Sequence, residues 1–220
     1  MLQSKLYSFE QDHWSKNLLI CGIDEVGRGC LAGPVVTAAA ILHKNVSHSL
    51  LIDSKKLSPQ NLIKMHQWLI NNCTYSVAIN SHAMIDQHNI YKTTQITMKQ
   101  ALLHLLVKTT QLPALILVDA MPLTLINTPY QDIPITSLTQ GESKSASIAA
   151  ASIIAKVTRD AIVTRLDASF PGYQFAQHKG YATKAHQNAL RLFHPSTIHR
   201  QTFLKKFSTK HKHAQQSIFL

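Results

Sequence analysis

Two short aliphatic segments, each followed directly by an aspartate, place the strongest constraint on how this chain can fold. Residues 18–23 lead into Asp24, and residues 114–118 lead into Asp119. Apolar runs of this length are typical of buried strands. In open α/β sheets, ligand sites gather at the carboxyl ends of the strands. If the two strands are neighbours, we expect Asp24 and Asp119 to meet at one edge of the sheet, with Glu25 beside them.

Three carboxylates at one place need a compensating positive charge, because each raises the pKa of the others unless a cation lies between them. Carboxylate oxygens suit hard ions such as Mg²⁺ or Mn²⁺ rather than zinc. A single aspartate at the end of a strand usually does no more than terminate it. Two such aspartates with an adjoining glutamate, in a chain of formal net charge +11, favour a metal site instead.

The other patterned segments alternate between strand-like and helix-like sequence. The strand-like segments are residues 35–42, 74–79 and 133–138. The helix-like segments are residues 59–71, 90–108, 145–169 and 183–193. This alternation predicts an α/β domain, and the glycine-rich connection between the first two strands predicts a mixed sheet. Small side chains dominate residues 146–152, so that helix can approach the sheet closely.

The charge balance indicates a polyanionic partner. Lys and Arg number 22, against 11 Asp and Glu. Such an excess raises affinity for nucleic acid, because each phosphate contact releases condensed counterions. Charge alone is equally compatible with a basic protein that has no such partner.

Several features argue against export and membrane insertion. We find no apolar stretch of the roughly 20 residues that a membrane helix needs, and residues 1–17 lack the layout of a signal peptide. Cys21, Cys30 and Cys73 show no C-x-x-C spacing, which favours a reducing compartment. We therefore expect a cytoplasmic protein, and we interpret most of its 13 histidines as surface or phosphate-facing groups.

The tripeptide Gly27, Arg28 and Gly29 follows the acidic pair directly. Glycine lets the backbone approach a ligand closely, and the forked guanidinium of Arg28 suits phosphate. The tripeptide alone would indicate only a tight turn. Its position beside the acids gives it a predicted role in substrate binding.

Residues 22–36 resemble the N-terminal signature of bacterial ribonuclease HII. Further blocks resemble that family in the same order, namely residues 53–58, 117–119, 141–145, 150–160, 178–183 and 199–200. The resemblance covers about residues 18–205. It implies a ribonuclease H-like mixed sheet flanked by helices, with a helical C-terminal part. Residues 1–17 would then be an N-terminal extension and residues 206–220 a basic tail.

The resemblance also implies an activity, which is hydrolysis of the RNA strand of RNA–DNA hybrids. Such an enzyme would also cut on the 5′ side of ribonucleotides embedded in duplex DNA. It would leave 5′-phosphate and 3′-hydroxyl ends, using two divalent ions, Mn²⁺ or Mg²⁺.

Four carboxylates are the implied catalytic and metal-binding residues. Asp24, Glu25 and Asp119 match three ligands of the family. Glu142 occupies the place of the fourth, which is usually an aspartate, and its side chain is one methylene longer. Asp160 competes for this role, but its position beside Arg159 on a helix favours a structural ion pair.

The substrate-binding residues follow from the same resemblance. Gly27, Arg28 and Gly29, together with Tyr181, would read the 2′-hydroxyl that distinguishes RNA from DNA. Lys55, Lys144 and Lys179 lie in polar loops and are expected to contact phosphates. Each of these lysines would otherwise be a solvated surface group.

The last six residues, 215–220, resemble the peptide by which bacterial replication proteins dock on the sliding clamp. We expect the protein to act as a monomer. Two other functions compete with the main interpretation. One is a ribonuclease HIII-type hybrid nuclease, which typically has a further N-terminal domain and lacks the Gly-Arg-Gly tripeptide. The other is a non-catalytic nucleic-acid-binding module, which would not need the three carboxylates together.

Overall fold

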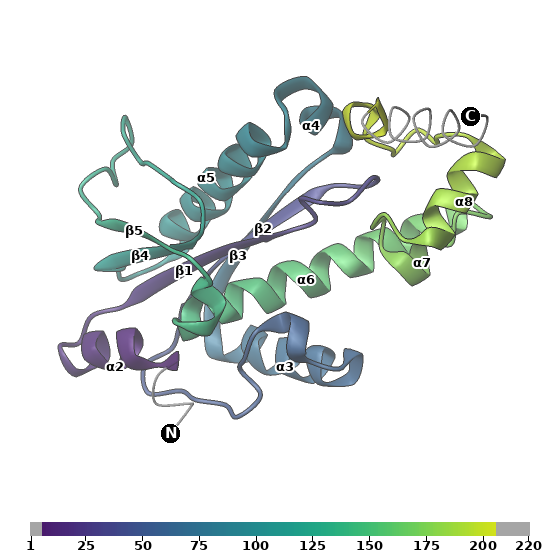
Figure 1. Cartoon of the computed structure of the whole chain (residues 1–220). Coiled ribbons are helices and arrows are strands. Elements are labelled where there is room, and N and C mark those ends of the chain that lie inside the picture. Colours follow the sequence, from purple (N-terminus) through teal and green to yellow (C-terminus); the bar gives the residue numbers. More distant parts are fainter. Residues whose placement is uncertain (1–5, 206–220) are drawn as a thin grey trace, which may run out of the picture.

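The centre of the protein is a mixed five-stranded sheet with strand order β3-β2-β1-β4-β5 (Figure 1). The computed structural model describes residues 6–205. The strands are β1 (Ile20–Val26), β2 (Val35–Leu42), β3 (Cys73–Asn80), β4 (Leu115–Asp119) and β5 (Ile135–Leu138). β2 runs antiparallel to β1 and β3, whereas β1, β4 and β5 are parallel. The predicted α/β class and mixed sheet are confirmed.

Helices cover both faces of the sheet (Figure 1). Helix α5 (Ile90–Lys108) packs on one face, and α6 (Ala146–Leu166) packs on the other with α3 (Pro59–Asn72) beside it. Strand β2 is buried along its whole length because its residues alternate between the two layers. Ala38 and Ala40 contact the α6 layer, whereas Ala39 and Ile41 contact the α5 layer.

Helix α6 lies unusually close to β1. A Cβ atom at Gly22 would lie only 2.1 Å from the main-chain carbon of Ser147, so no other residue fits there without movement. The small residues of α6, including Ala149 and Ala150, are buried along this contact. The prediction that this helix approaches the sheet closely is confirmed.

Three helices were not expected from the sequence of the described residues. They are α2 (Ser8–Ser15), α4 (His82–His88) and the four-residue α7 (Phe175–His178). Helix α2 lies near the N-terminal end of α6 (Figure 1), where Glu10 is buried. One oxygen of the Glu10 carboxylate accepts hydrogen bonds from Ser145 Oγ at 2.7 Å and from the Ser147 amide at 2.9 Å. This carboxylate therefore caps the start of α6, where a negative charge is favourable.

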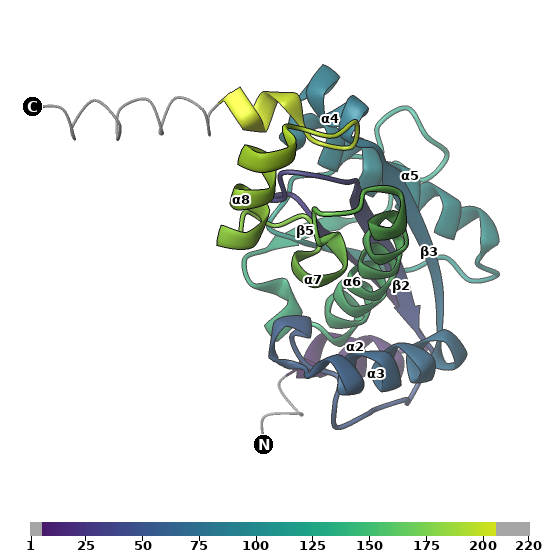
Figure 2. The same cartoon turned by 90° about the vertical axis from the view of Figure 1, so that its right-hand side faces the viewer.

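The expected helical C-terminal part lies at the other end of α6 (Figure 1), the side that faces the viewer in Figure 2. It contains α7 (Phe175–His178) and α8 (Lys184–Phe193). Three of its histidines, His178, His186 and His199, are buried, so they are neither surface nor phosphate-facing groups. None of the helices within residues 6–205 has the length and apolar character that a bilayer span requires.

We predict that Glu10→Ala lowers the free energy of unfolding by about 1–2 kcal/mol, as the loss of a helix cap does. Urea denaturation followed by circular dichroism measures this change. Asp12→Ala on the same helix is the matched control, because Asp12 is exposed and its ion pairs, with Lys16 and His13, lie at the surface. The control should change stability by less than about 0.5 kcal/mol. Equal effects of the two variants would contradict a capping role for Glu10.

Candidate active site

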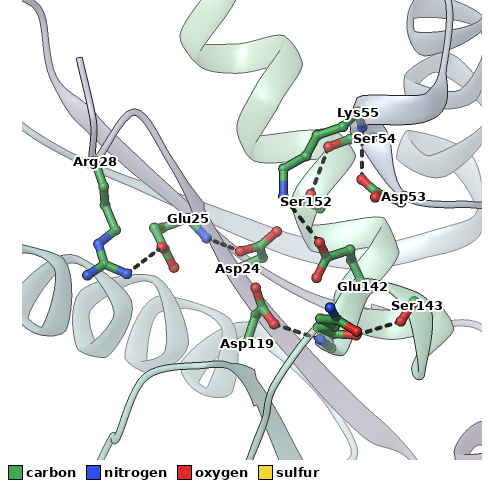
Figure 3. A network of polar contacts seen from close by, with 12 residues as sticks. Asp24, Glu25, Arg28, Asp53, Ser54, Lys55, Asp119, Glu142, Ser143 and Ser152 are labelled. Atoms are coloured by element: carbon green, nitrogen blue, oxygen red, sulfur yellow. Dashed lines mark hydrogen bonds and ion pairs between the residues drawn. The ribbon is translucent and has the colours of Figure 1, made fainter.

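Asp24 and Asp119 lie side by side at the carboxyl ends of neighbouring strands. β1 and β4 pair in parallel, with Ile23 opposite Val118, so the next residue of each strand reaches the same edge. Figure 3 shows the carboxylates of Asp24 and Asp119 facing one another, with that of Glu142 nearby. The predicted adjacency of the two aspartates is confirmed.

Glu25 leaves the strand in a different direction from Asp24, as successive residues of a strand do. Its Oε1 pairs with Arg28 Nη1 at 3.2 Å (Figure 3). Its Oε2 is buried and has no hydrogen-bond partner. The arginine of the tripeptide therefore neutralises part of the acidic cluster.

Glu142 reaches the cluster from a short 3-10 helix, Gly141–Ser143, whose start is fixed by Asp119. The amide of Gly141 donates to Asp119 Oδ1 at 2.6 Å. Glu142 is buried, and its Oε1 accepts from Lys55 Nζ at 3.2 Å. Its Oε2, like that of Glu25, is buried without a hydrogen-bond partner.

Asp160 lies on α6 and is held by another charge. Its carboxylate pairs with Lys156 Nζ at 2.9 Å, one helical turn away. The structural ion pair expected for Asp160 is present, but its partner is Lys156. The neighbouring Arg159 is fully buried and donates to the carbonyls of Ala32, Pro34 and Lys179.

The site carries negative charge that its surroundings do not fully compensate. Burial and the nearby carboxylates of Glu25 and Asp119 hold the pKa of Asp24 well above its usual range. Burial also raises the pKa of Glu25, although Arg28 opposes the shift. Burial raises the pKa of Asp119, which the hydrogen bond from Gly141 opposes. All three carboxylates are therefore less stable in the ionised form than they would be in water.

A hard cation fits this donor set. The buried, unpartnered oxygens of Glu25 and Glu142 are acceptors without a donor, and raised pKa values are relieved when a cation binds. Within residues 6–205, no three His, Cys, Asp or Glu side chains are arranged closely enough to bind the same metal ion in their present conformations. Arg28 and Lys55 instead engage one oxygen of Glu25 and one of Glu142.

A cleft of about 700 Å³ opens beside the carboxylates. The residues lining it that the sequence had not singled out are Val26, Ser54, Leu57, Pro59, Leu62, Ser152, Lys156 and Gln177. The Ser152 hydroxyl lowers the pKa of Asp24, against the effect of burial, and its Oγ lies 3.0 Å from Ser54 Oγ. Ser152 was missed because it belongs to the small-residue face of α6, where a serine looks like a packing residue.

The two glycines of the tripeptide differ in their surroundings. Gly27 has φ +95°, and a Cβ atom there would lie 2.2 Å from Arg159 Nε. Gly29 has no atom within 4 Å of such a Cβ, so its surface is open to a ligand. Tyr181 lines the cleft and is partly exposed, with Lys156 Nζ 5.7 Å from its ring centre.

The three predicted lysines differ in their surroundings. Lys55 lines the cleft and pairs with Glu142. Lys179 also lines it, but its ammonium donates to Thr164 Oγ1 at 2.7 Å and to a main-chain carbonyl of α7. Lys144 is exposed and is not among the residues that line the cleft.

Comparisons with known proteins agree with this arrangement. The sequence model of the ribonuclease HII family matches residues 21–209. Ribonuclease HII of Lactobacillus helveticus is 44% identical over 198 residues, which is 90% of this chain and 75% of that protein. Ribonuclease HII of Staphylococcus epidermidis is 46% identical over 190 residues, which is 86% of this chain and 70% of that protein.

Solved structures share the fold at lower sequence identity. One is the PCNA:RNase HII complex from Archaeoglobus fulgidus, with TM-score 0.68, 23% identity and coverage of 84% of this chain and 94% of that one. Another is Bst-RNase HIII in complex with Mn²⁺, with TM-score 0.61, 18% identity and coverage of 84% and 67%. They confirm the expected ribonuclease H-like fold.

We predict that Asp24→Asn stabilises the protein in EDTA at neutral pH. Removing the charge ends the cost of burying an ionised carboxylate beside Glu25 and Asp119, which is what raises the pKa of Asp24. We expect a gain in the free energy of unfolding on the order of 1–3 kcal/mol, measured by urea denaturation. The gain should shrink as pH falls through the raised pKa, because the wild-type carboxyl then becomes neutral in the folded state.

Asp132→Asn is the control for this prediction, since Asp132 is exposed. Its effect should stay within about 0.5 kcal/mol. If Asp24→Asn does not raise the free energy of unfolding above that of this control, burial and the neighbouring carboxylates do not destabilise the ionised form of Asp24.

Proposed function

Because this chain belongs to the ribonuclease HII family and is therefore a ribonuclease H endonuclease, we propose that it hydrolyses the RNA strand of RNA–DNA hybrids and also cuts 5′ of single ribonucleotides in duplex DNA. The observation that carries this proposal is the meeting of Asp24 and Asp119 at adjacent strand ends. Buried carboxylate oxygens with no donor lie beside them. A non-catalytic binding module would have no use for this uncompensated charge.

The carboxylates would hold two divalent ions, Mn²⁺ or Mg²⁺. In this proposal the ligands are Asp24, Glu25, Asp119 and Glu142. The ions would supply an activated water and neutralise the charge that develops on the leaving 3′ oxygen. The solved Mn²⁺ complex of Bst-RNase HIII supports a metal site in this fold.

Residues in the cleft, together with Gly29 and Lys144 outside it, would orient the substrate. The open backbone at Gly29 and the side chain of Tyr181 would contact the 2′-hydroxyl, which both donates and accepts hydrogen bonds. Lys55, Lys179 and the outlying Lys144 would contact phosphates. Such contacts position the strand, whereas the 2′-hydroxyl contact selects RNA.

The ribonuclease HIII-type alternative has weaker support. The family model and the relatives above 40% identity are ribonuclease HII. The HIII structures are at most 20% identical among those compared, and this chain covers 63% and 67% of two of them.

A duplex containing one ribonucleotide, incubated with the protein and Mn²⁺ or Mg²⁺, tests the proposal directly. We expect one cut on the 5′ side of the ribonucleotide, complete loss of cutting in EDTA, and recovery when the ion is restored. Asp24→Asn should abolish cutting while leaving hybrid binding largely intact, because phosphate contacts supply most of the affinity. Cutting that persists in EDTA would refute the metal-dependent mechanism.

The fourth ligand can be identified with two matched neutral variants. We expect Glu142→Gln to lower the cleavage rate by at least about 100-fold, since a metal site contributes several kcal/mol to the transition state. Asp160→Asn should leave the rate close to that of the wild type, because Asp160 already pairs with Lys156. Mn²⁺ titration calorimetry should show weaker binding for the first variant alone. The opposite pattern would assign the role to Asp160.

We also propose that the C-terminal peptide, residues 215–220, docks on the sliding clamp. This peptide lies outside the described residues, so its support is the sequence pattern and a solved archaeal relative in complex with PCNA. Deleting these six residues should abolish binding to the bacterial clamp and leave cleavage of a short duplex unchanged. Unchanged clamp affinity after the deletion would exclude this role.

A further inference from the structure

Three buried histidines of the C-terminal part lie in contact with one another. The rings of His178 and His186 stack at 4.2 Å, and Nε2 of His186 lies 2.9 Å from Nε2 of His199. Burial lowers the pKa of both His186 and His199 to about 4. Both rings are therefore neutral at physiological pH, so each has one donor and one acceptor nitrogen.

The hydrogen bonds of these histidines form a series in which each proton is donated in the same direction. The amide of Ser196 donates to His199 Nδ1 at 2.9 Å, which leaves the proton of His199 on Nε2. That proton is donated to Nε2 of His186, whose own proton is then on Nδ1. His186 Nδ1 lies 2.9 Å from the main-chain carbonyl of Tyr181 and donates to it. This series of hydrogen bonds thus ends at the main-chain carbonyl of Tyr181, the tyrosine that lines the cleft.

The residue after His199, Arg200, extends to the loop that contains the tripeptide Gly27, Arg28 and Gly29. Its guanidinium is fully buried and donates to the carbonyl of Gly27 at 2.7 Å and to that of Arg28 at 2.9 Å. It also donates to the carbonyls of Gly33 and Pro34. These acceptors are main-chain oxygens, so the charge of Arg200 serves to hold the backbone around the tripeptide.

The backbone of this His-Arg pair is itself fixed to the segment after the tripeptide. The Arg200 amide donates to the Leu31 carbonyl at 2.8 Å, and Ala32 forms a β-bridge with His199. Successive side chains of such an extended segment point in opposite directions. One therefore reaches towards Tyr181 and the other towards the tripeptide.

We propose that His199 and Arg200 are positioning residues that fix the tripeptide and Tyr181 relative to each other, and thereby set the preference for a single ribonucleotide. This inference rests on the proposed contact of the tripeptide and Tyr181 with the 2′-hydroxyl. A lone ribonucleotide offers one 2′-hydroxyl, so the tripeptide and Tyr181 must both be placed to contact that same group. A continuous RNA strand offers one at every position and tolerates a displaced loop. A displacement of about 1 Å can slow a reaction by about 100-fold.

The test compares cleavage of a duplex with one ribonucleotide and of a continuous RNA–DNA hybrid. We expect His199→Leu to lower the ratio of the two kcat/KM values by about 10- to 100-fold. His199→Gln retains an amide donor towards His186 and should restore much of the ratio. Arg200→Lys keeps the charge but not the fork, so it should also lower the ratio.

Leu190→Ala is the matched control, because Leu190 is a buried member of the apolar cluster in the C-terminal part and its side chain has no polar atom. It should lower the melting temperature without changing the ratio. If His199→Leu and Leu190→Ala leave the same ratio, the positioning role is refuted and the effect is structural. If the wild type cuts neither substrate, the proposed function itself has failed.

A second measurement needs no variant. Nitrogen-15 NMR of the histidine rings should find the proton of His186 on Nδ1 and that of His199 on Nε2. The opposite tautomers, or a charged ring at pH 7, would contradict the proposed order of hydrogen bonds from His199 through His186 to Tyr181.

Discussion

The close contact between α6 and β1 is the constraint on which most of this structure depends. It exists because Gly22 has no side chain where the backbone of Ser147 passes. From that position α6 supplies Ser152 to Asp24 and Arg159 to the loops of the C-terminal part. Its N-terminus begins directly after the turn that carries Glu142. A small displacement of α6 would therefore alter the site at several points together.

The electrostatics of the site oppose the stability of the fold. Burial raises the pKa values of Asp24, Glu25 and Asp119, which means that ionising them destabilises the folded state. Arg28 and Lys55 relieve only part of this charge, since one oxygen of Glu25 and one of Glu142 remain without donors. Functional sites commonly retain such strain, because the unsatisfied groups are those that bind a ligand.

Much of the sheet and the meeting of the two aspartates could be predicted from sequence, for a physical reason. Strands β1 and β4 are buried along most of their length, so they appear as aliphatic runs, and the acids follow these runs near the strand ends. Helix α2 left no such signal, because its apolar residues Phe9 and Trp14 are only partly buried and its buried residue is Glu10, whose carboxylate caps α6. Its contact partner lies more than a hundred residues away, which local periodicity does not encode.

The locations of charged and titratable residues were the hardest to predict from the sequence, because composition does not distinguish a solvated charge from a buried one. The formal charge of +11 correctly indicated the class of partner. Yet Arg159 and Arg200 are buried and donate to main-chain carbonyls, so they add nothing to the contact surface for phosphates. A buried guanidinium is stable only when its donors find acceptors, and loops rich in glycine and proline expose carbonyls that no strand or helix satisfies. The glycines that make the substrate loops open to a ligand therefore also create the need for the buried arginines that hold them in place.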